Sequence, residues 1–198
     1  MAVKDHKLTK SVGEHFTCAA LAQEGWAASL TRDGVARTDV LAVHGDSRRM
    51  IEVQVKTSTT WERPSWLLGE VEVAESQREW YVLVALGRTV RDRPRCFVVP
   101  RDHVAAGVWI RHMAWLTDPA VPPGRRNTPL KRSRAGVEVW VGYEERWDAL
   151  SDDNAIGKIR LPLWMRDASS TERVGLPPDH PWQETAAARE WLGEEPGT

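Results

Sequence analysis

The chain has 198 residues, of which 41% are hydrophobic and 28% are charged, and its formal net charge is −1. This composition is ordinary for a globular protein with one sizeable core, and no apolar run approaches the roughly 18 residues that a membrane-spanning helix needs. The opening segment MAVKDHKLTKSVGEHF lacks the apolar region of a secretory signal, and Cys18 and Cys96 stand far apart. We therefore expect a cytoplasmic protein with reduced cysteines and no membrane partner.

The first predicted element is a helix within LTKSVGEHFTCAALAQEGW, residues 8–26. Ser11 can cap its start, and Glu14, three residues later, would complete a capping box. Gly25 ends the helical pattern. The presence of Glu14 can therefore be explained by helix capping alone, as well as by a role in chemistry.

Three strands with tight turns follow this helix. WAASL (26–30), TDVLAV (38–43) and RRMIEVQVK (48–56) read as strands, and Asp-Gly and HGDS mark the turns between them. Residues 79–87 and 94–100 are continuous apolar runs typical of buried strands, and a second helix starts after Pro100. This order predicts an α/β (α+β) fold with a mixed central β-sheet flanked by helices.

Positive charge gathers in the middle of the chain. Residues 88–134 hold 11 Lys and Arg against three Asp, whereas residues 138–198 carry a net charge of −7. Such a basic band can follow the phosphates of nucleic acid, or it can be a set of solvated loops. If it binds nucleic acid, the candidate contacts are Arg125, Arg126, Lys131, Arg132 and Arg134.

The last part of the chain is harder to place. VEVWV (137–141) suggests a further strand and YEERWDALS (143–151) a helix. Residues 151–198 are acidic and rich in proline, with one helix expected in HPWQETAAAREWL (180–192), and they hold too few apolar residues to bury a core alone. We therefore predict one domain at 1–150 with a C-terminal irregular or helical appendage at 151–198.

One face of the strand MIEVQVKTS is unusually polar. Glu52, Gln54 and Lys56 point one way while the intervening apolar residues point the other. In an antiparallel hairpin, Asp39 would lie roughly opposite the Glu52–Gln54 stretch. A carboxylate and an amide oxygen at a strand end suit Mg²⁺, and Lys56 beside them could hold a water or neutralise charge on phosphorus.

The residues GEHFTCAALAQEGW, TDVLAV and IEVQVKTS, in this order, resemble the core of the PD-(D/E)xK nucleases, which have the restriction-endonuclease-like fold. The pattern is most similar to Holliday-junction resolvases and to intron-encoded homing endonucleases whose third motif carries Gln. The resemblance covers roughly residues 9–105. It implies that Asp39, the Gln54 amide oxygen and the Val55 carbonyl surround Mg²⁺, with Mn²⁺ as a substitute. It also implies an outer or second-metal role for Glu14 and a water-positioning role for Lys56.

Two departures from the family pattern matter. Thr38 replaces the usual proline, which is a minor variation. Gln54 replaces an acidic residue and leaves the site one negative charge short. Asp39 can also be read as an edge-strand charge, and Lys56 as a lysine that snorkels to solvent.

The resemblance leaves two functions open. One is a Mg²⁺-dependent DNA endonuclease that leaves 5′-phosphate and 3′-hydroxyl ends, with a homodimer able to cut both strands. The other is a catalytically impaired module of the same fold that binds nucleic acid or a protein partner.

Overall fold

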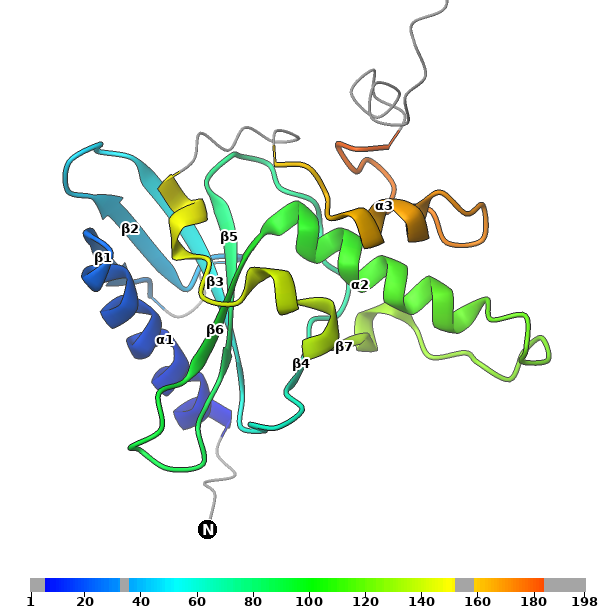
Figure 1. Cartoon of the computed structure of the whole chain (residues 1–198), viewed down its shortest axis with the longest axis horizontal. Coiled ribbons are helices and arrows are strands. Elements are labelled where there is room, and N and C mark those ends of the chain that lie inside the picture. Colours follow the sequence, from blue (N-terminus) through cyan, green and yellow to red (C-terminus); the bar gives the residue numbers. More distant parts are fainter. Residues whose placement is uncertain (1–5, 33–35, 152–158, 184–198) are drawn as a thin grey trace, which may run out of the picture.

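A five-stranded sheet forms the centre of the computed structural model, which describes residues 6–32, 36–151 and 159–183 (Figure 1). The strand order is β1-β2-β3-β5-β6, and all neighbours are antiparallel except β3 and β5, which are parallel. The sheet is therefore mixed, as predicted. The strands are β1 (Trp26–Leu30), β2 (Val40–His44), β3 (Met50–Ser58), β5 (Glu79–Ala85) and β6 (Arg95–Pro100).

Helices cover both faces of this sheet (Figure 1). A helix, α1 (His6–Gln23), packs on one face, and α2 (Arg101–Leu116) and α3 (Leu163–Ser169) lie on the other. A two-stranded sheet of β4 (Ser65–Leu67) and β7 (Arg134–Gly136) packs beside α2. No helix in the described ranges has both the length and the apolar character needed to cross a membrane.

The expected strands are present, with ends that differ by a few residues from the predicted ranges. The hairpin of β2 and β3 is antiparallel, with Val40 opposite Val53. The proposed cap at Ser11 is wrong, because α1 already includes His6 and Ser11 lies well inside it. Its main-chain oxygen instead accepts a hydrogen bond from His15 Nδ1 at 2.8 Å, so Glu14 is not the third residue of a capping box.

The strand expected at 137–141 is also wrong. Two successive 3-10 turns, η2 (Val137–Val139) and η3 (Val141–Tyr143), occupy this stretch. The buried residues are Val139, Trp140 and Tyr143, and this spacing follows the three-residue period of a 3-10 helix rather than the alternation of a strand.

The helix expected at 143–151 is reduced to a 3-10 helix, η4 (Trp147–Ser151). Glu145 has a φ of 52°, which interrupts a right-handed helix. Its carboxylate instead accepts the Cys96 N–H at 2.9 Å, while Glu144 pairs with Arg95. These contacts fasten the segment to the start of β6.

Residues 159–183 pack on α2. Leu161, Met165, Val174 and Trp182 belong to the core on that face of the sheet, and His180 Nε2 donates to the Asp102 carbonyl at 3.0 Å. The domain boundary at residue 150 stays a prediction. The helix predicted within 180–192 falls mostly outside the described residues.

The approach of α1 to β3 is unusually close at Gly13. A Cβ built at Gly13 would overlap Thr57 Oγ1, so only glycine allows this contact without a shift. The contact brings the next residue of α1, Glu14, to the edge of the sheet near Asp39. Helix position and site geometry are therefore coupled.

This contact predicts a non-additive pair of substitutions. Gly13→Ala should lower the free energy of unfolding by about 1–3 kcal/mol, because the added methyl group overpacks the helix–sheet contact. In a Thr57→Ala background the same change should cost far less, since the overlapping hydroxyl is gone and alanine favours helix by about 1 kcal/mol. Urea denaturation of the four proteins in this cycle measures the coupling, and additive effects would contradict the contact.

Candidate active site

The site forms where β2 ends and β3 continues. Val40 is the first residue of β2 and lies opposite Val53, whereas β3 runs on to Ser58. Asp39 fills the gap: its N–H donates to the Val53 carbonyl at 2.9 Å, and its Oδ2 accepts the Val55 N–H at 2.8 Å. The Asp39 carboxylate thus takes the place of a main-chain partner and lies at the open edge of the sheet.

Glu14 reaches the same edge from α1. Lys10 Nζ lies 3.1 Å from Glu14 Oε1 and 3.1 Å from Asp39 Oδ1, so one ammonium group joins the two carboxylates. Desolvation raises the pKa of Glu14, and the charge of Asp39 raises it further, while Lys10 acts in the opposite direction. The hydrogen bonds from Lys10, first to Asp39 and then to Glu14, raise the pKa of Lys10 itself.

Gln54 lies on the face of the sheet that α2 covers. Its Oε1 accepts a hydrogen bond from Arg101 Nη1 at 3.4 Å. Arg101 is almost fully buried, lies over the Tyr81 ring and is 3.3 Å from Glu79 Oε2. The structure therefore groups Asp39 with Glu14 and Lys10, and it groups Gln54 with Arg101.

Glu52, the third polar residue of this face, accepts a hydrogen bond from Thr38 Oγ1 at 3.4 Å.

Lys56 is partly buried next to these two groups. Desolvation lowers its pKa; Asp39 opposes this shift, whereas the positive charges of Lys10 and Arg101 add to it. Lys56 also lines a cavity of about 590 Å³ that opens beside the end of β3. Lys56 is thus a partly desolvated amine close to a carboxylate and next to an open cavity.

The oxygen atoms at this edge suit a divalent cation. Asp39 and Glu14 already converge on one positive charge, and the Val55 carbonyl points to the same edge because a strand residue directs its N–H and C=O the same way. Within the described ranges no three His, Cys, Asp or Glu side chains gather to hold a metal. A bound Mg²⁺ would therefore depend on main-chain, water and phosphate oxygens as well, which is usual for this ion.

The basic band is largely neutralised by neighbouring carboxylates. Arg126 pairs with Asp118 and lies over Trp115, and five further arginines of the band pair with glutamates: Arg88, Arg93, Arg95, Arg101 and Arg111. Of the predicted nucleic-acid contacts, Arg125, Lys131 and Arg132 are exposed and have no ion pair with the described residues, and Arg134 bonds to Ser65. The count of charged residues over 88–134 therefore overestimates the unpaired positive charge on the surface.

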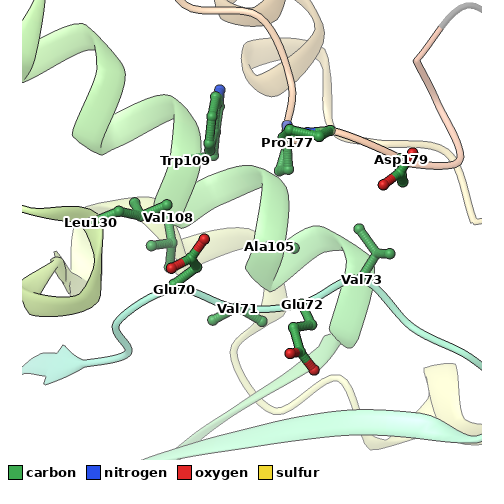
Figure 2. Close-up of a pocket in the computed structure, with 11 residues that line it drawn as sticks. Glu70, Val71, Glu72, Val73, Ala105, Val108, Trp109, Leu130, Pro177 and Asp179 are labelled. Carbon is green, nitrogen blue, oxygen red and sulfur yellow. The ribbon is translucent and has the colours of Figure 1, made fainter.

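A second cavity, of about 240 Å³, lies under α2 and does not suit a phosphate. Figure 2 shows Glu70, Val71 and Glu72 along one extended segment, with Trp109 of α2 and Asp179 of the C-terminal segment around them. Its floor is apolar and its charged lining residues, Glu70, Glu72 and Asp179, are all acidic. The cavity beside Lys56 is thus the better place for an anionic substrate.

Sequence reasoning missed Lys10 and Arg101. Lys10 stands four residues before Glu14 on one helix, a spacing typical of an ion pair, so a signal for it was present. Arg101 had no such signal, because its partners Gln54 and Glu79 come from distant strands.

Comparison with known proteins identifies no family. No family model and no curated protein matches the chain. Among solved structures the chain is similar to a bacterial homing endonuclease, with a TM-score of 0.48 and 14% sequence identity over 77% of this chain and 95% of that one. Function is therefore inferred from the residues of this chain alone.

The partial desolvation of the Lys56 amine predicts that Lys56→Met stabilises the protein at neutral pH. A lowered pKa means that the charged amine is less favourable in the folded state, and stability rises with pH from the lowered pKa up to the unfolded value near 10.5. The gain from the substitution should therefore shrink between neutral pH and about pH 10. Urea denaturation across this range measures it, and a loss of stability at pH 7 would contradict the desolvation.

The bridging ammonium predicts that Lys10→Met strengthens cation binding. Removing Lys10 leaves the Glu14 and Asp39 carboxylates without their shared positive charge, so Mn²⁺ should bind about three- to tenfold more tightly, a modest effect because Lys10 is half-exposed. Calorimetric titration with Mn²⁺ measures this, and Lys131→Met, in the exposed part of a 3-10 turn (Leu130–Arg132), is the matched control. Equal affinities for all three proteins would show that the carboxylate pair is not the cation site.

Proposed function

We propose that this protein is a metal-dependent DNA endonuclease that hydrolyses phosphodiester bonds at the Glu14–Asp39–Lys56 edge. The observation that carries the proposal is the convergence of two carboxylates, one from α1 and one from the residue just before β2, on the Lys10 ammonium group beside a desolvated lysine. Carboxylates that bind a cation next to an amine suit phosphoryl transfer, because that reaction needs the negative charge of the phosphate to be neutralised and the nucleophile to be oriented.

Each residue has a distinct task in this proposal. Asp39, Glu14 and the Val55 carbonyl would hold Mg²⁺ or Mn²⁺, and Gln54 would join them by turning away from Arg101. When bound, the metal lowers the pKa of a water molecule and offsets negative charge on the phosphate. The Val55 N–H orients the Asp39 carboxylate by holding Oδ2.

Lys56 supplies the proton chemistry. Its lowered pKa makes Nζ a better proton acceptor near neutral pH than an ordinary lysine, so Nζ can hold the attacking water and take its proton. The water oxygen forms a bond to phosphorus as the bond to the 3′-oxygen breaks. The 3′-oxygen takes up a proton from a solvent water, which leaves a 5′-phosphate and a 3′-hydroxyl.

A second candidate is a module of the same fold that binds nucleic acid or a protein partner without cleaving. Lys10 already joins Glu14 to Asp39, and Arg101 already binds Gln54, so the polar groups are satisfied without a metal. This candidate predicts identical binding in the presence and absence of Mg²⁺.

Plasmid nicking with added Mg²⁺ or Mn²⁺ separates the two candidates. The wild-type protein should nick supercoiled DNA only with metal, and Asp39→Asn and Lys56→Met should each lower the rate by about a hundredfold or more. Asp39→Asn keeps an oxygen for the Val55 N–H, so the fold should persist. Asp46→Asn, at the exposed turn of the β2–β3 hairpin, is the matched control and should cut normally.

Circular dichroism should first establish that each variant is folded. Metal-independent nicking, or nicking that survives both substitutions, would contradict the proposed site. Metal-independent DNA binding without any cleavage would favour the second candidate.

A further inference from the structure

The cavity that Lys56 lines is walled by hydroxyl groups. It lies between the first turn of α1, the end of β3 and the small β4–β7 sheet, and Figure 1 shows these segments at the same end of the molecule. Its volume of about 590 Å³ is within the usual range of about 300–1,000 Å³ for ligand sites. Six hydroxyl side chains line it, from α1, from β3 and the residues just after it, and from β4: Thr9, Thr57, Ser58, Thr59, Thr60 and Ser65. We call this cavity the hydroxyl groove.

All charged or protonatable residues that line the hydroxyl groove are basic. They are His6, Lys56 and Arg134, and no carboxylate belongs to the lining that the structure describes. Hydroxyl, imidazole, amine and guanidinium groups can donate hydrogen bonds to phosphate oxygens. The acidic cavity under α2 has the opposite lining, which makes the hydroxyl groove the phosphate-compatible cavity of the two.

Arg134 is held in place for such a contact. Its Nη2 donates to the main-chain oxygen and to Oγ of Ser65, each at 3.1 Å, across the pairing of β4 with β7. Both bonds use one end of the guanidinium, and Nη1 and Nε have no other bond within the described residues. The group can therefore present a fixed donor pair to a phosphate.

Arg134 also lines a second hollow. This hollow, of about 300 Å³, is lined by Arg111, Arg132 and the partly exposed Trp115, among others. The two spaces meet at Arg134, so basic and aromatic groups continue the path that begins at Lys56. Basic residues interleaved with an aromatic ring suit a nucleic-acid strand.

We propose that one strand of the DNA substrate leaves the Lys56 edge through the hydroxyl groove and that Arg134 binds a phosphate next to the one that is cut. This inference rests on the proposed function for the identity of the substrate. It makes Arg134 a positioning residue rather than a catalytic one, because Arg134 lies outside the Glu14–Asp39–Lys56 group. It also separates Arg134 from Arg125 and Arg126, which line neither of these two spaces.

Fluorescence anisotropy with a labelled DNA oligonucleotide in Ca²⁺-containing buffer tests the path without relying on cleavage. Arg134→Gln should weaken binding about fivefold or more, and the slope of log Kd against log salt should fall by about 0.9, the value for one lost phosphate contact on duplex DNA. Thr59→Glu, which places a carboxylate in the hydroxyl groove, should weaken binding at least as much. Arg93→Gln, an exposed arginine paired with Glu145, is the matched control and should bind as wild type does.

The outcomes separate this inference from the proposed function. If the wild-type protein binds DNA through Arg134 but never cuts it, the path stands and hydrolysis fails. If the wild-type protein cuts DNA while Arg134→Gln and Thr59→Glu keep its affinity and salt slope, the path is overturned and hydrolysis stands. If the wild-type protein binds no DNA, both are overturned. Thermal denaturation of each variant establishes that lost binding is not lost folding.

Discussion

The hydrogen bond from the Val55 N–H to the Asp39 carboxylate is the contact on which the site depends. Where the main chain of β2 stops pairing with β3, the Asp39 side chain accepts the hydrogen bond instead. The edge of β3 therefore stays open while the buried Val55 N–H still has an acceptor. The same bond fixes the carboxylate at that edge. Because Gly13 lets α1 approach Thr57 closely, Glu14 and Lys10 arrive at the same place. The early end of β2 and the close approach at Gly13 thus bring together polar groups of α1, Asp39 and β3.

Several charged groups of both signs lie close together around this edge. Two carboxylates, Asp39 and Glu14, meet Lys10, while Lys56 and Arg101 lie near enough for their charges to affect each other. Glutamine at position 54 in place of an acidic residue leaves no third carboxylate, and Arg101 holds its amide. We infer that the site needs a strongly charged ligand, a divalent cation together with a phosphate, to displace Lys10. Desolvation at Lys56 works against stability and favours reactivity, a combination common at functional sites.

Local sequence patterns were enough to predict most of the strands, but they predicted few of the side-chain contacts within the site. Alternating and continuous apolar runs were enough to predict the strands around Asp39 and Gln54, because burial on a sheet leaves that signature in the sequence. Ser11 was misread as a cap because local signals do not mark how far a helix extends toward the N-terminus. Trp140 lies between two 3-10 turns where alternation suggested a strand. The partners of Gln54 and Arg101 are long-range contacts that no local spacing encodes.

The central claim is that the Asp39 and Glu14 carboxylates form a cation site from which Lys10 is displaced. A crystal structure of the full chain soaked in Mn²⁺, with anomalous scattering recorded to locate the metal, tests it most directly. We predict an anomalous peak bonded to both carboxylates at about 2.0–2.3 Å, with the Lys10 ammonium moved out of contact with at least one of them. A Lys10 that still bridges Asp39 and Glu14, with the manganese elsewhere or absent, would contradict the claim.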